Sequence, residues 1–394
     1  MQRLDINKQI EIIRRGAVEI ISEEELRTKL QESVRTKRPL NIKAGFDPTS
    51  PDIHLGHTVL LRKLRQFQDL GHKVIFVIGD FTARIGDPSG RQETRKQLNI
   101  EEVLANANTY KSQAAKILDV DKMQIAFNSE WFDKMSVLDI LKLTTHATVA
   151  QMLARSDFKK RLSKGEDISL LEFMYPLLQG YDSVKLEADI ELGGTDQIFN
   201  LLVGRDIQKD FGQAQQVVIT MPLLEGTDGI QKMSKSYANF IAINENPNEM
   251  FGKIMSISDE MMLKFYTLLT DEDLEAVRKK HPKEAKLSLA ENIVRQYHGR
   301  DLAEKARQEF EQVFSKRELP KDIPVYKLKK QRSSIIDILL DSGLTESKNE
   351  ARRLIQQGGV SFDGERLDKE DIIVDKEGIL KVGKRRFLKL IKEK

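Results

Sequence analysis

Five consecutive apolar residues, Val74 to Ile78, lie inside the segment 73–81 and place a strong limit on the fold. A strand that is apolar at every position is buried on both faces, which is typical of a parallel sheet. The preceding segment, 53–70, carries apolar residues at helical spacing and ends at Gly71, the position of a helix C-cap. With the short strand-like run 41–46 in front of it, the pattern predicts one β-α-β unit.

The same alternation recurs in the second part of the chain. A strand-like run at 188–192 is followed by the turn Gly193-Gly194, a helical pattern at 195–211 and a strand at 217–224. Strands that alternate with helices form parallel sheets, and ligands bind beyond the carboxyl ends of their strands. The predicted fold class is therefore α/β, with a Rossmann-like parallel-sheet domain.

Other segments interrupt or precede this alternation. The opening stretch is helical and ends before Pro39, with Ser22 and Glu25 spaced as a capping box. A largely helical insert at about 99–181 could be a lid or an oligomer interface. Its Trp131, the single tryptophan of the chain, suits an interface as readily as a core.

We predict four divisions of the chain. The sheet domain, with its insert, covers 1–224, and a helical domain covers 225–320. A linker at 321–330 is indicated by two prolines and six basic residues between 316 and 330. A small α+β unit follows at 331–394.

The composition excludes several kinds of chemistry. The 394 residues include no cysteine, which excludes disulfides, zinc sites built from cysteine, and thiol nucleophiles. Because 64 Lys and Arg residues nearly balance 61 Asp and Glu residues, net charge alone indicates no polyanionic partner. We find no apolar run of about 18 residues and no charged-then-apolar amino terminus, so we expect a cytosolic protein that makes no use of a membrane.

Two histidines lie three residues apart in His54-Leu55-Gly56-His57, at the start of the predicted helix 53–70. A helix N-terminus favours anions, and Gly56 leaves space for a flat ring such as adenine against the backbone. Two other interpretations are polar surface histidines and a two-histidine metal site. The metal site is disfavoured because no cysteine and no evident third ligand accompany the pair.

A second motif, Lys232-Met233-Ser234-Lys235-Ser236, follows Gly226 and Gly229 after the strand 217–224. In a mobile loop at that position, two lysines can reach phosphates held at the helix start. A lysine ammonium is a point charge that suits a leaving pyrophosphate. A solvated surface loop would have the same composition, but the two motifs in this order are far more specific than either one alone.

Together these motifs resemble the two signature sequences of class I aminoacyl-tRNA synthetases. Nearly the whole chain resembles the bacterial tyrosyl-tRNA synthetases that carry a C-terminal S4 RNA-binding domain. Three more stretches carry the resemblance: Gly45-Phe-Asp-Pro-Thr49, Gly86-Asp-Pro-Ser-Gly90, and Tyr175 to Asp182 leading into Gly193-Gly-Thr-Asp-Gln197.

This resemblance implies a two-step activity. Tyrosine would be activated by ATP to tyrosyl-adenylate and pyrophosphate, and then transferred to the 3′ terminal adenosine of tRNA(Tyr). Mg²⁺ would accompany ATP, with no tightly bound cofactor. The resemblance also implies a homodimer in which the insert forms much of the interface.

The resemblance assigns residues to three groups within the site and assigns no metal ligand. The phosphates and the pyrophosphate are assigned to Thr49, His54, His57, Arg91, Arg95, Lys232 and Lys235. Other contacts to ATP are assigned to Gly45, Asp47, Gly56, Gly194, Asp196, Met233 and Ser234. Tyrosine is assigned to Asp87, Tyr175, Gln179, Asp182 and Gln197, and we add Lys43 to this group as our own hypothesis. An alternative for Arg91 and Arg95 is that they are ordinary exposed charges.

The implied roles agree with the chemistry of tyrosine activation. A tyrosine carboxylate is ionised at neutral pH, so its attack on the α-phosphate needs position and charge neutralisation more than a general base. Asp182 would accept a hydrogen bond from the phenol. Such a site rejects phenylalanine, which would leave the carboxylate unpaired; tyrosyl-tRNA synthetases are themselves the established example of this selection.

Lys43 departs from the family pattern. Many bacterial relatives carry a tyrosine two residues before the glycine that corresponds to Gly45, as a second partner of the phenol. Because of its place in the predicted strand 41–46, our hypothesis is that Lys43 donates to the phenol oxygen or to Asp182.

The last part of the chain indicates an RNA partner. Helical patterns at 334–340 and 347–357, followed by a strand-rich end, resemble an S4-type RNA-binding domain. The candidate RNA-binding residues are Lys348, Arg352, Arg353, Lys381, Lys384, Arg385 and Arg386. Their contacts with phosphates would be salt-dependent. A solubilising basic tail is the alternative interpretation.

Two other functions stay open. A sister enzyme that charges tryptophan could share the sheet and both signatures, but it would need neither Asp182 nor the C-terminal RNA unit. A non-catalytic RNA-binding protein on the same scaffold is disfavoured, because the histidines and lysines of both motifs are intact. We therefore expect a synthetase that charges tyrosine.

Overall fold

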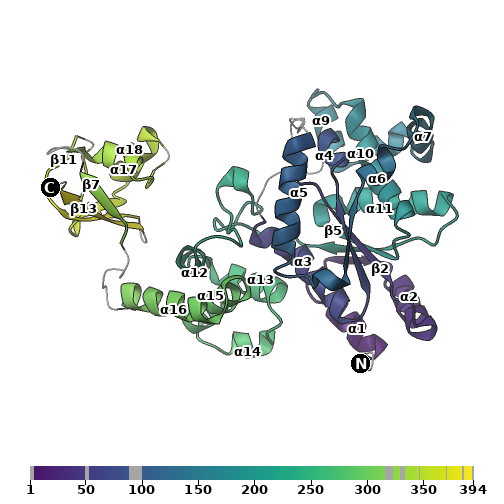
Figure 1. Cartoon of the computed structure of the whole chain (residues 1–394), viewed down its shortest axis with the longest axis horizontal. Coiled ribbons are helices and arrows are strands. Elements are labelled where there is room, and N and C mark those ends of the chain that lie inside the picture. The colour runs from purple at the N-terminus through teal and green to yellow at the C-terminus, as the bar shows by residue number, and fades with distance from the viewer. Residues whose placement is uncertain are drawn as a thin grey trace. The chain divides into compact units, whose positions relative to one another are not determined.

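The computed structural model describes residues 4–48, 53–87, 100–315, 323–328, 333–345, 347–369, 371–383 and 386–392 (Figure 1). The chain divides into two compact units. The first is Met1–Asn246 with Lys253–Tyr297, and the second is Pro247–Gly252 with His298–Lys394. Within the described ranges, no helix has the length and apolar character needed to span a membrane.

A six-stranded sheet forms the centre of the first unit, with the strand order β1-β6-β5-β2-β3-β4. Strands β2 to β6 pair in parallel, and β1 pairs antiparallel with β6. The strands, from β1 to β6, are Glu19–Ile21, Asn41–Phe46, Lys73–Ile78, Met123–Phe127, Ile190–Gly194 and Val217–Met221. The predicted Rossmann-like sheet is confirmed, and Val74 to Ile78 are all buried because β3 lies between β2 and β4.

The strand order reverses between β2 and β5. From β2 the chain proceeds to β3 and β4 on one side, and later from β5 to β6 on the other. Right-handed crossovers in opposite directions place the connecting helices α3 (Leu55–Asp69) and α11 (Ile198–Asp210) on opposite faces of the sheet (Figure 1). The carboxyl ends of β2 and β5 therefore open the crevice in which such sheets bind ligands.

The opening stretch contains one element that the sequence does not predict. Helices α1 (Ile6–Arg14) and α2 (Glu23–Thr36) are separated by β1, which adds an edge strand to the sheet. With three residues, β1 is too short to show a period of its own. The capping box is confirmed: Ser22 Oγ accepts from the N–H of Glu25 at 3.1 Å, and the Glu25 carboxylate accepts from the N–H of Ser22 at 3.5 Å.

Two further predictions about the sheet are corrected. Residues 123–127, predicted as part of the helical insert, form the edge strand β4; only Ala126 of this strand is buried, so it lacks the apolar run that marks β3. Gly193 and Gly194, predicted as a turn, are the last residues of β5 and pair with Thr220 and Met221. The chain turns later, in the short 3₁₀ helix Thr195–Gln197.

Helices fill most of the segment between β3 and β5. In order from α4 to α10 they are Thr82–Ile85, Ile100–Ala114, Ser129–Phe132, Val137–Leu143, Val149–Leu153, Ser156–Ser163 and Leu170–Lys185. Met152, Leu177, Val184 and Ile207 form a buried cluster between α8, α10 and α11. This cluster fixes α10, which carries several predicted site residues, against the sheet domain.

Five more helices follow the sheet. From α12 to α16 they are Pro247–Met255, Asp259–Leu269, Leu274–Arg278, Pro282–His298 and Arg300–Ser315. The division between the compact units runs through the predicted helical domain 225–320, because α13 and α14 belong to the first unit and α16 to the second.

The carboxyl-terminal part of the second unit combines two helices with two small sheets. Helices α17 (Ile335–Asp341) and α18 (Lys348–Gln356) share a buried core with a sheet of order β10-β9-β12-β13-β7. A second sheet pairs β11 with β8. The strands, from β7 to β13, are Val325–Leu328, Ser333–Ser334, Val360–Phe362, Glu365–Arg366, Ile373–Val374, Gly378–Val382 and Arg386–Lys392. Strand β7 lies within the predicted linker 321–330, so that part of the linker belongs to the folded unit.

Candidate active site

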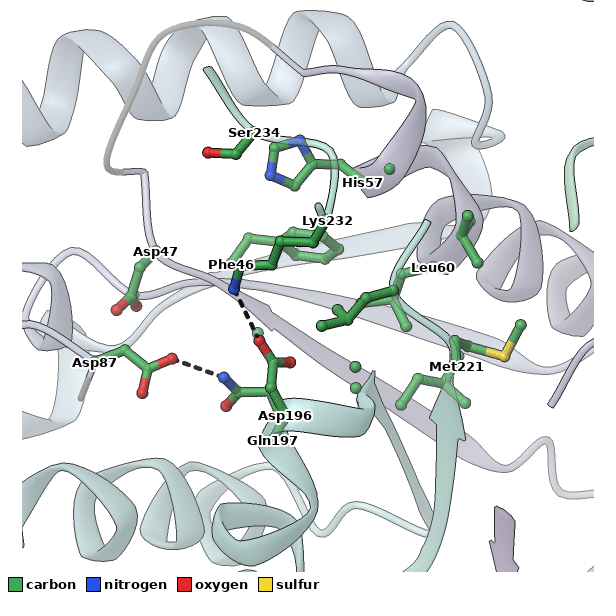
Figure 2. Close-up of a pocket in the computed structure, with 18 of the residues that line it drawn as sticks. Phe46, Asp47, His57, Leu60, Asp87, Asp196, Gln197, Met221, Lys232 and Ser234 are labelled. Atoms are coloured by element: carbon green, nitrogen blue, oxygen red, sulfur yellow. Dashed lines mark hydrogen bonds and ion pairs between the residues drawn. The ribbon is translucent and has the colours of Figure 1, made fainter. Parts of the chain in front are cut away.

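A cavity of about 460 Å³ opens at the crevice between β2 and β5 (Figure 2). This volume falls in the usual range for small-molecule sites, about 300–1,000 Å³. The predicted site residues that line it are Gly45, Asp47, His54, Gly56, His57, Asp87, Tyr175, Gln179, Asp182, Gly194, Asp196, Gln197, Lys232, Met233, Ser234 and Lys235. Three residues predicted for the active site lie outside the described part of the chain: Thr49, Arg91 and Arg95.

The two histidines stack on each other at the amino end of α3. Their ring centroids are 3.8 Å apart, and the N–H of His54 donates to Nδ1 of His57 at 3.3 Å. Burial, aided by the nearby charge of Lys235, lowers the pKa of His57 to about 4 and that of His54 to about 2. Both imidazoles are therefore neutral at physiological pH and offer N–H donors without a positive charge.

The start of α3 is bonded to the chain that follows the lysine motif, residues 232–236. The N–H of Leu55 donates to the carbonyl of Ile241 at 2.9 Å, and the N–H of Ile243 donates to the carbonyl of Ile53 at 3.1 Å. At Gly56 a Cβ atom would lie 3.0 Å from the His54 ring and 3.5 Å from Met233. The histidine pair and the lysine motif thus meet at a point where only a glycine leaves space.

The lysine motif completes a hairpin after β6. The N–H of Met233 donates to the carbonyl of Leu224 at 2.8 Å, and Met233 is buried. On one side of this anchor, Lys232 Nζ lies 3.4 Å from Asp196 Oδ2 across the cavity. On the other side, Ser234 caps the short 3₁₀ helix Lys235–Tyr237. Figure 2 shows Lys232 directed toward Asp196, with Ser234 on the same side of the cavity as His57.

Asp182 lies on α10 and is buried at the inner end of the cavity. Its Oδ1 accepts a hydrogen bond of 3.0 Å from Nε1 of Trp131, and its Oδ2 accepts one of 3.4 Å from Asn128. Burial raises the pKa of Asp182 to about 7, although the charge of Lys43 and these two hydrogen bonds oppose the shift. Trp131 was predicted as core or interface, and its contact with Asp182 adds a role that no local sequence pattern indicates.

Asp47 and Tyr175 are hydrogen-bonded to each other in the lining of the cavity. Tyr175 Oη donates to Asp47 Oδ2 at 2.8 Å, and Thr82 Oγ1 donates to Asp47 Oδ1 at 2.8 Å. Burial, with the charge of Asp47 close by, raises the pKa of Tyr175 well above its ordinary value, so the phenol stays protonated. Gly79 makes this arrangement possible, since a Cβ there would lie 2.1 Å from Asp47 Oδ1.

A chain of amides links the predicted tyrosine-binding residues. Gln197 Nε2 donates to Asp87 Oδ2 at 2.7 Å, which Figure 2 shows. Asn200 Nδ2 lies 3.0 Å from both Gln197 Oε1 and Gln179 Oε1, and it therefore orients the two glutamines together. Arg155 in turn donates to Asn200 Oδ1 at 3.0 Å. Asn200 and Arg155 are support residues that sequence reasoning missed, because neither belongs to a motif.

The structure contradicts the hypothesis for Lys43. Its ammonium is fully buried and donates to Glu191 Oε1 at 2.8 Å, Ser183 Oγ at 2.7 Å and the carbonyl of Gln179 at 2.9 Å. An ammonium has three donors, so these partners use all of them. The reason is the register of the sheet: Lys43 of β2 is the direct neighbour of Glu191 on β5. Lys43 therefore does not line the cavity. Its three donors are used by Glu191, Ser183 and the carbonyl of Gln179.

The predicted RNA-binding residues lie in the second unit. Arg352 and Arg353 are exposed on α18, where Lys348 pairs with Asp337 at 3.0 Å. Lys381 of β12 lies over the ring of Phe387, its neighbour on β13, at 5.4 Å from the centroid. Arg386 donates to the carbonyl of Leu344, between the two helices. Lys384 and Arg385 fall outside the described residues.

Comparison with known families agrees with this geometry. The model of the family described as tRNA synthetases class I (W and Y) matches residues 35–315, which include strands β2 to β6, both motifs and the cavity. A second model, described as the tyrosine-tRNA ligase SYY-like C-terminal domain, matches residues 315–388. The sheet, the crevice and the two motifs are therefore those of a class I aminoacyl-tRNA synthetase.

Comparison with individual proteins identifies the family within this class. The chain is 52% identical over 410 residues to the tyrosine-tRNA ligase of Carboxydothermus hydrogenoformans, covering 99% of each chain. It is 52% identical over 403 residues to that of Desulfotalea psychrophila, covering 99% of this chain and 100% of the other. A truncated mitochondrial tyrosyl-tRNA synthetase from Aspergillus nidulans shares the fold, with a TM-score of 0.64, 22% identity, and coverage of 79% of this chain and 95% of that one. The chain belongs to the tyrosine-tRNA ligase family.

Proposed function

We propose that this chain activates tyrosine with ATP in the cavity at β2 and β5, releases pyrophosphate, and transfers the tyrosyl group to the 3′ terminal adenosine of tRNA(Tyr). The observation that carries the proposal is the joining of three features in one cavity. These are a buried carboxylate at its inner end, a stacked histidine pair at a helix start, and a loop with two lysines. The proposed activity belongs to translation, and we propose that the protein acts in the cytoplasm.

ATP is proposed to lie between the start of α3 and the lysine motif. Adenine fits against Gly56, where a side chain would collide with the His54 ring. The ribose is assigned to Gly194 and Asp196 at the end of β5. His54 and His57 are proposed to donate neutral N–H groups to the phosphates, next to the positive end of the helix dipole.

Tyrosine is proposed to bind with its phenol toward Asp182. The buried carboxylate accepts the phenolic hydrogen bond, and Trp131 and Asn128 hold it in place. Asp87, Tyr175, Gln179 and Gln197 are assigned to the substrate ammonium. The chain of amides described above supports this assignment, because it fixes both glutamines by hydrogen bonds to Asn200.

The chemical step is proposed to need no general base. The tyrosine carboxylate attacks the α-phosphate directly, since it is already ionised at neutral pH. Lys232 and Lys235 neutralise the charge that develops on the leaving pyrophosphate. Mg²⁺ enters as part of the ATP complex and shares that charge. Lys232 must leave Asp196 for this role, and an exposed pair of this kind costs only about 0–1 kcal/mol to break.

The C-terminal unit is proposed to hold the tRNA through Arg352, Arg353, Lys381 and Arg386. Exposed arginine and lysine side chains on a helix and on neighbouring strands suit the phosphates of RNA. Lys348 shares the exposed helix α18, although it pairs with Asp337 in the free protein.

A homodimer formed through the insert is also proposed. Three apolar side chains of α7 are exposed: Val137 by 77%, Leu138 by 61% and Leu141 by 56%. Val149 of α8 and Leu170 of α10 are exposed in the same insert, by 66% and 80%. A cluster of exposed apolar residues marks an interaction surface, and a second copy of the chain is the occupant that the family resemblance suggests. Sedimentation of the wild type and of Leu141→Glu tests this, with a monomer expected only for the variant.

Charging of tRNA tests the proposed function. Wild-type protein is expected to transfer labelled tyrosine to unfractionated tRNA in the presence of ATP and Mg²⁺. The double variant Lys232→Ala, Lys235→Ala is expected to bind tyrosine normally and to charge at a strongly reduced rate. Protein that binds tRNA but charges no amino acid would leave only an RNA-binding role.

A further inference from the structure

Asn239 lies directly behind the lysine motif and is buried, with 3% of its surface exposed. Its side chain is outside the set of residues that line the cavity. Both of its polar atoms bond the backbone of the motif. Oδ1 accepts from the N–H of Ser234 at 2.8 Å, and Nδ2 lies 3.2 Å from the carbonyl of Lys232.

These two contacts bracket Met233. One amide therefore fixes the backbone on both sides of the buried anchor, and with it the direction in which Lys232 and Ser234 leave the chain. The main chain of Asn239 adds a further tie, since its carbonyl accepts from the N–H of Thr227 at 2.9 Å. Through this one residue, the lysine motif is bonded to Thr227 in the first half of its own hairpin.

Asp228 holds Asn239 in turn. Its Oδ2 accepts from Asn239 Nδ2 at 2.8 Å, while its Oδ1 accepts from the N–H groups of Ile230 and Gln231 at 3.0 and 3.1 Å. One carboxylate thus closes the hairpin turn and orients the amide. Gly226 leaves the space for this contact, because a Cβ there would lie 2.2 Å from Asn239 Cγ.

We propose that Asn239, oriented by Asp228, is a positioning residue that sets the placement of Lys232 and Lys235 over the triphosphate. This inference rests on the function proposed above for the two lysines. Asn239 touches neither substrate nor pyrophosphate; it acts by keeping the lysines at the distance that the transition state needs. A misplacement of about 1 Å in such a group can cost about 10²-fold in rate.

The first experiment compares Asn239→Ala with wild type in the exchange of labelled pyrophosphate into ATP without tRNA. The expected result is a loss of about 10²-fold in kcat. Tyrosine affinity is expected to stay within about twofold, as for independent sites. The matched control is Asn244→Ala, an exposed asparagine in the same segment that bonds Lys116 and stays outside the cavity. A control that lost as much activity as Asn239→Ala would overturn the inference.

A coupling test separates positioning from a general effect on folding. If Asn239 acts through the lysines, adding Asn239→Ala to the Lys232→Ala, Lys235→Ala variant removes little more activity. If Asn239 only supports the fold, the two losses multiply, as independent effects do. Multiplying losses would therefore contradict the inference. Exchange that is absent in the wild type would instead contradict the proposed function.

A second pair of variants guards against a misfolded alanine variant. Asn239→Asp keeps the size of the side chain and the acceptor for Ser234, but it sets a carboxylate against that of Asp228 and against the carbonyl of Lys232. Adding Asp228→Asn returns an amide donor to the pair. This double variant is expected to recover at least half of the lost activity, measured on a logarithmic scale. Asp228→Asn, Asn239→Asp protein no more active than Asn239→Asp alone would overturn the role of Asp228.

Discussion

The indole Nε1 of Trp131 donates a hydrogen bond of 3.0 Å to Oδ1 of Asp182, the carboxylate at the inner end of the cavity. Trp131 lies in the short helix α6, which follows β4, whereas Asp182 lies on α10. The contact therefore ties the edge of the sheet to α10, which carries three of the residues predicted to bind tyrosine. It also opposes the rise in the pKa of Asp182 that burial causes.

The first prediction concerns the affinity for tyrosine. Because the pKa of Asp182 is raised to about 7, the carboxylate gains its charge between pH 6 and pH 8. A charged acceptor strengthens the bond from the phenol by about 1 kcal/mol, which corresponds to about fivefold in affinity. Titration calorimetry is expected to show tyrosine binding that tightens over this range. Asp182→Asn should abolish the trend, and a trend that persists in this variant would exclude Asp182 as its source.

The same pKa shift predicts how stability depends on pH. The folded chain holds the Asp182 proton up to about pH 7, but the unfolded chain loses it near its ordinary value of 3.8. Unfolding free energy is therefore reduced as pH rises through this window, by about 1.4 kcal/mol for each pKa unit. The variant Asp182→Asn has no carboxyl group at this position, so its free energy of unfolding does not fall through this titration. Urea unfolding should show the variant gaining on the wild type between pH 4.5 and pH 8, and an unchanged difference would contradict the account.

The third prediction concerns the histidine pair. Burial keeps the pKa of His57 near 4 and that of His54 near 2, so neither ring gains a proton between pH 8 and pH 5. NMR titration is expected to leave the signals of His54 and His57 without a shift over that range. His54→Gln and His57→Gln identify which signals these are. If both signals moved with midpoints near 6.5, the phosphates would meet charged imidazoliums and the neutral-donor role would be wrong.

The fourth prediction concerns Lys43 and Glu191. Both side chains are almost completely buried, and their charged atoms lie 2.8 Å apart. Removing Lys43 leaves the buried charge of Glu191 with only the neutral donors of Gln179, Ser183 and Gln216, and breaking a buried pair in this way costs about 3–5 kcal/mol. Lys43→Met is therefore expected to lower the free energy of unfolding by that amount in urea denaturation. Adding Glu191→Gln should recover most of it, because an amide of the same shape carries no charge.

Tyrosine binding distinguishes this support role from contact with the substrate. In the Lys43→Met, Glu191→Gln variant, selection against phenylalanine is expected to survive, since Asp182 still meets the phenol. If a folded variant lost that selection, we would conclude that Lys43 contacts the substrate after all.

Structural features that depend on residues close together in the chain could be predicted from the sequence. The apolar run at 74–78 gave a buried strand, the spacing of Ser22 and Glu25 gave a capping box, and Gly71 ended α3 with a φ of 85°. The two signature motifs and the resemblance assigned 16 of the 30 described residues that line the cavity. Local pattern was sufficient in these cases because each feature is formed within a few residues.

Features built from distant segments could not be predicted in this way. The direction of Lys43 depends on the pairing of β2 with β5, which places Glu191 beside it across 148 positions of the chain. Asn239 contacts Asp228, Lys232 and Ser234 together only after the hairpin has folded back on itself. Strand β4 was missed because an edge strand buries too little surface to need a continuous apolar run.

The most direct test of the central claim is exchange of labelled pyrophosphate into ATP with tyrosine, phenylalanine and tryptophan supplied separately and without tRNA. The account predicts exchange with tyrosine alone, because only its phenol donates to Asp182 within this cavity. Equal exchange with phenylalanine would show that Asp182 does not select the substrate. Exchange with tryptophan in place of tyrosine would assign the cavity to the other amino acid of the class.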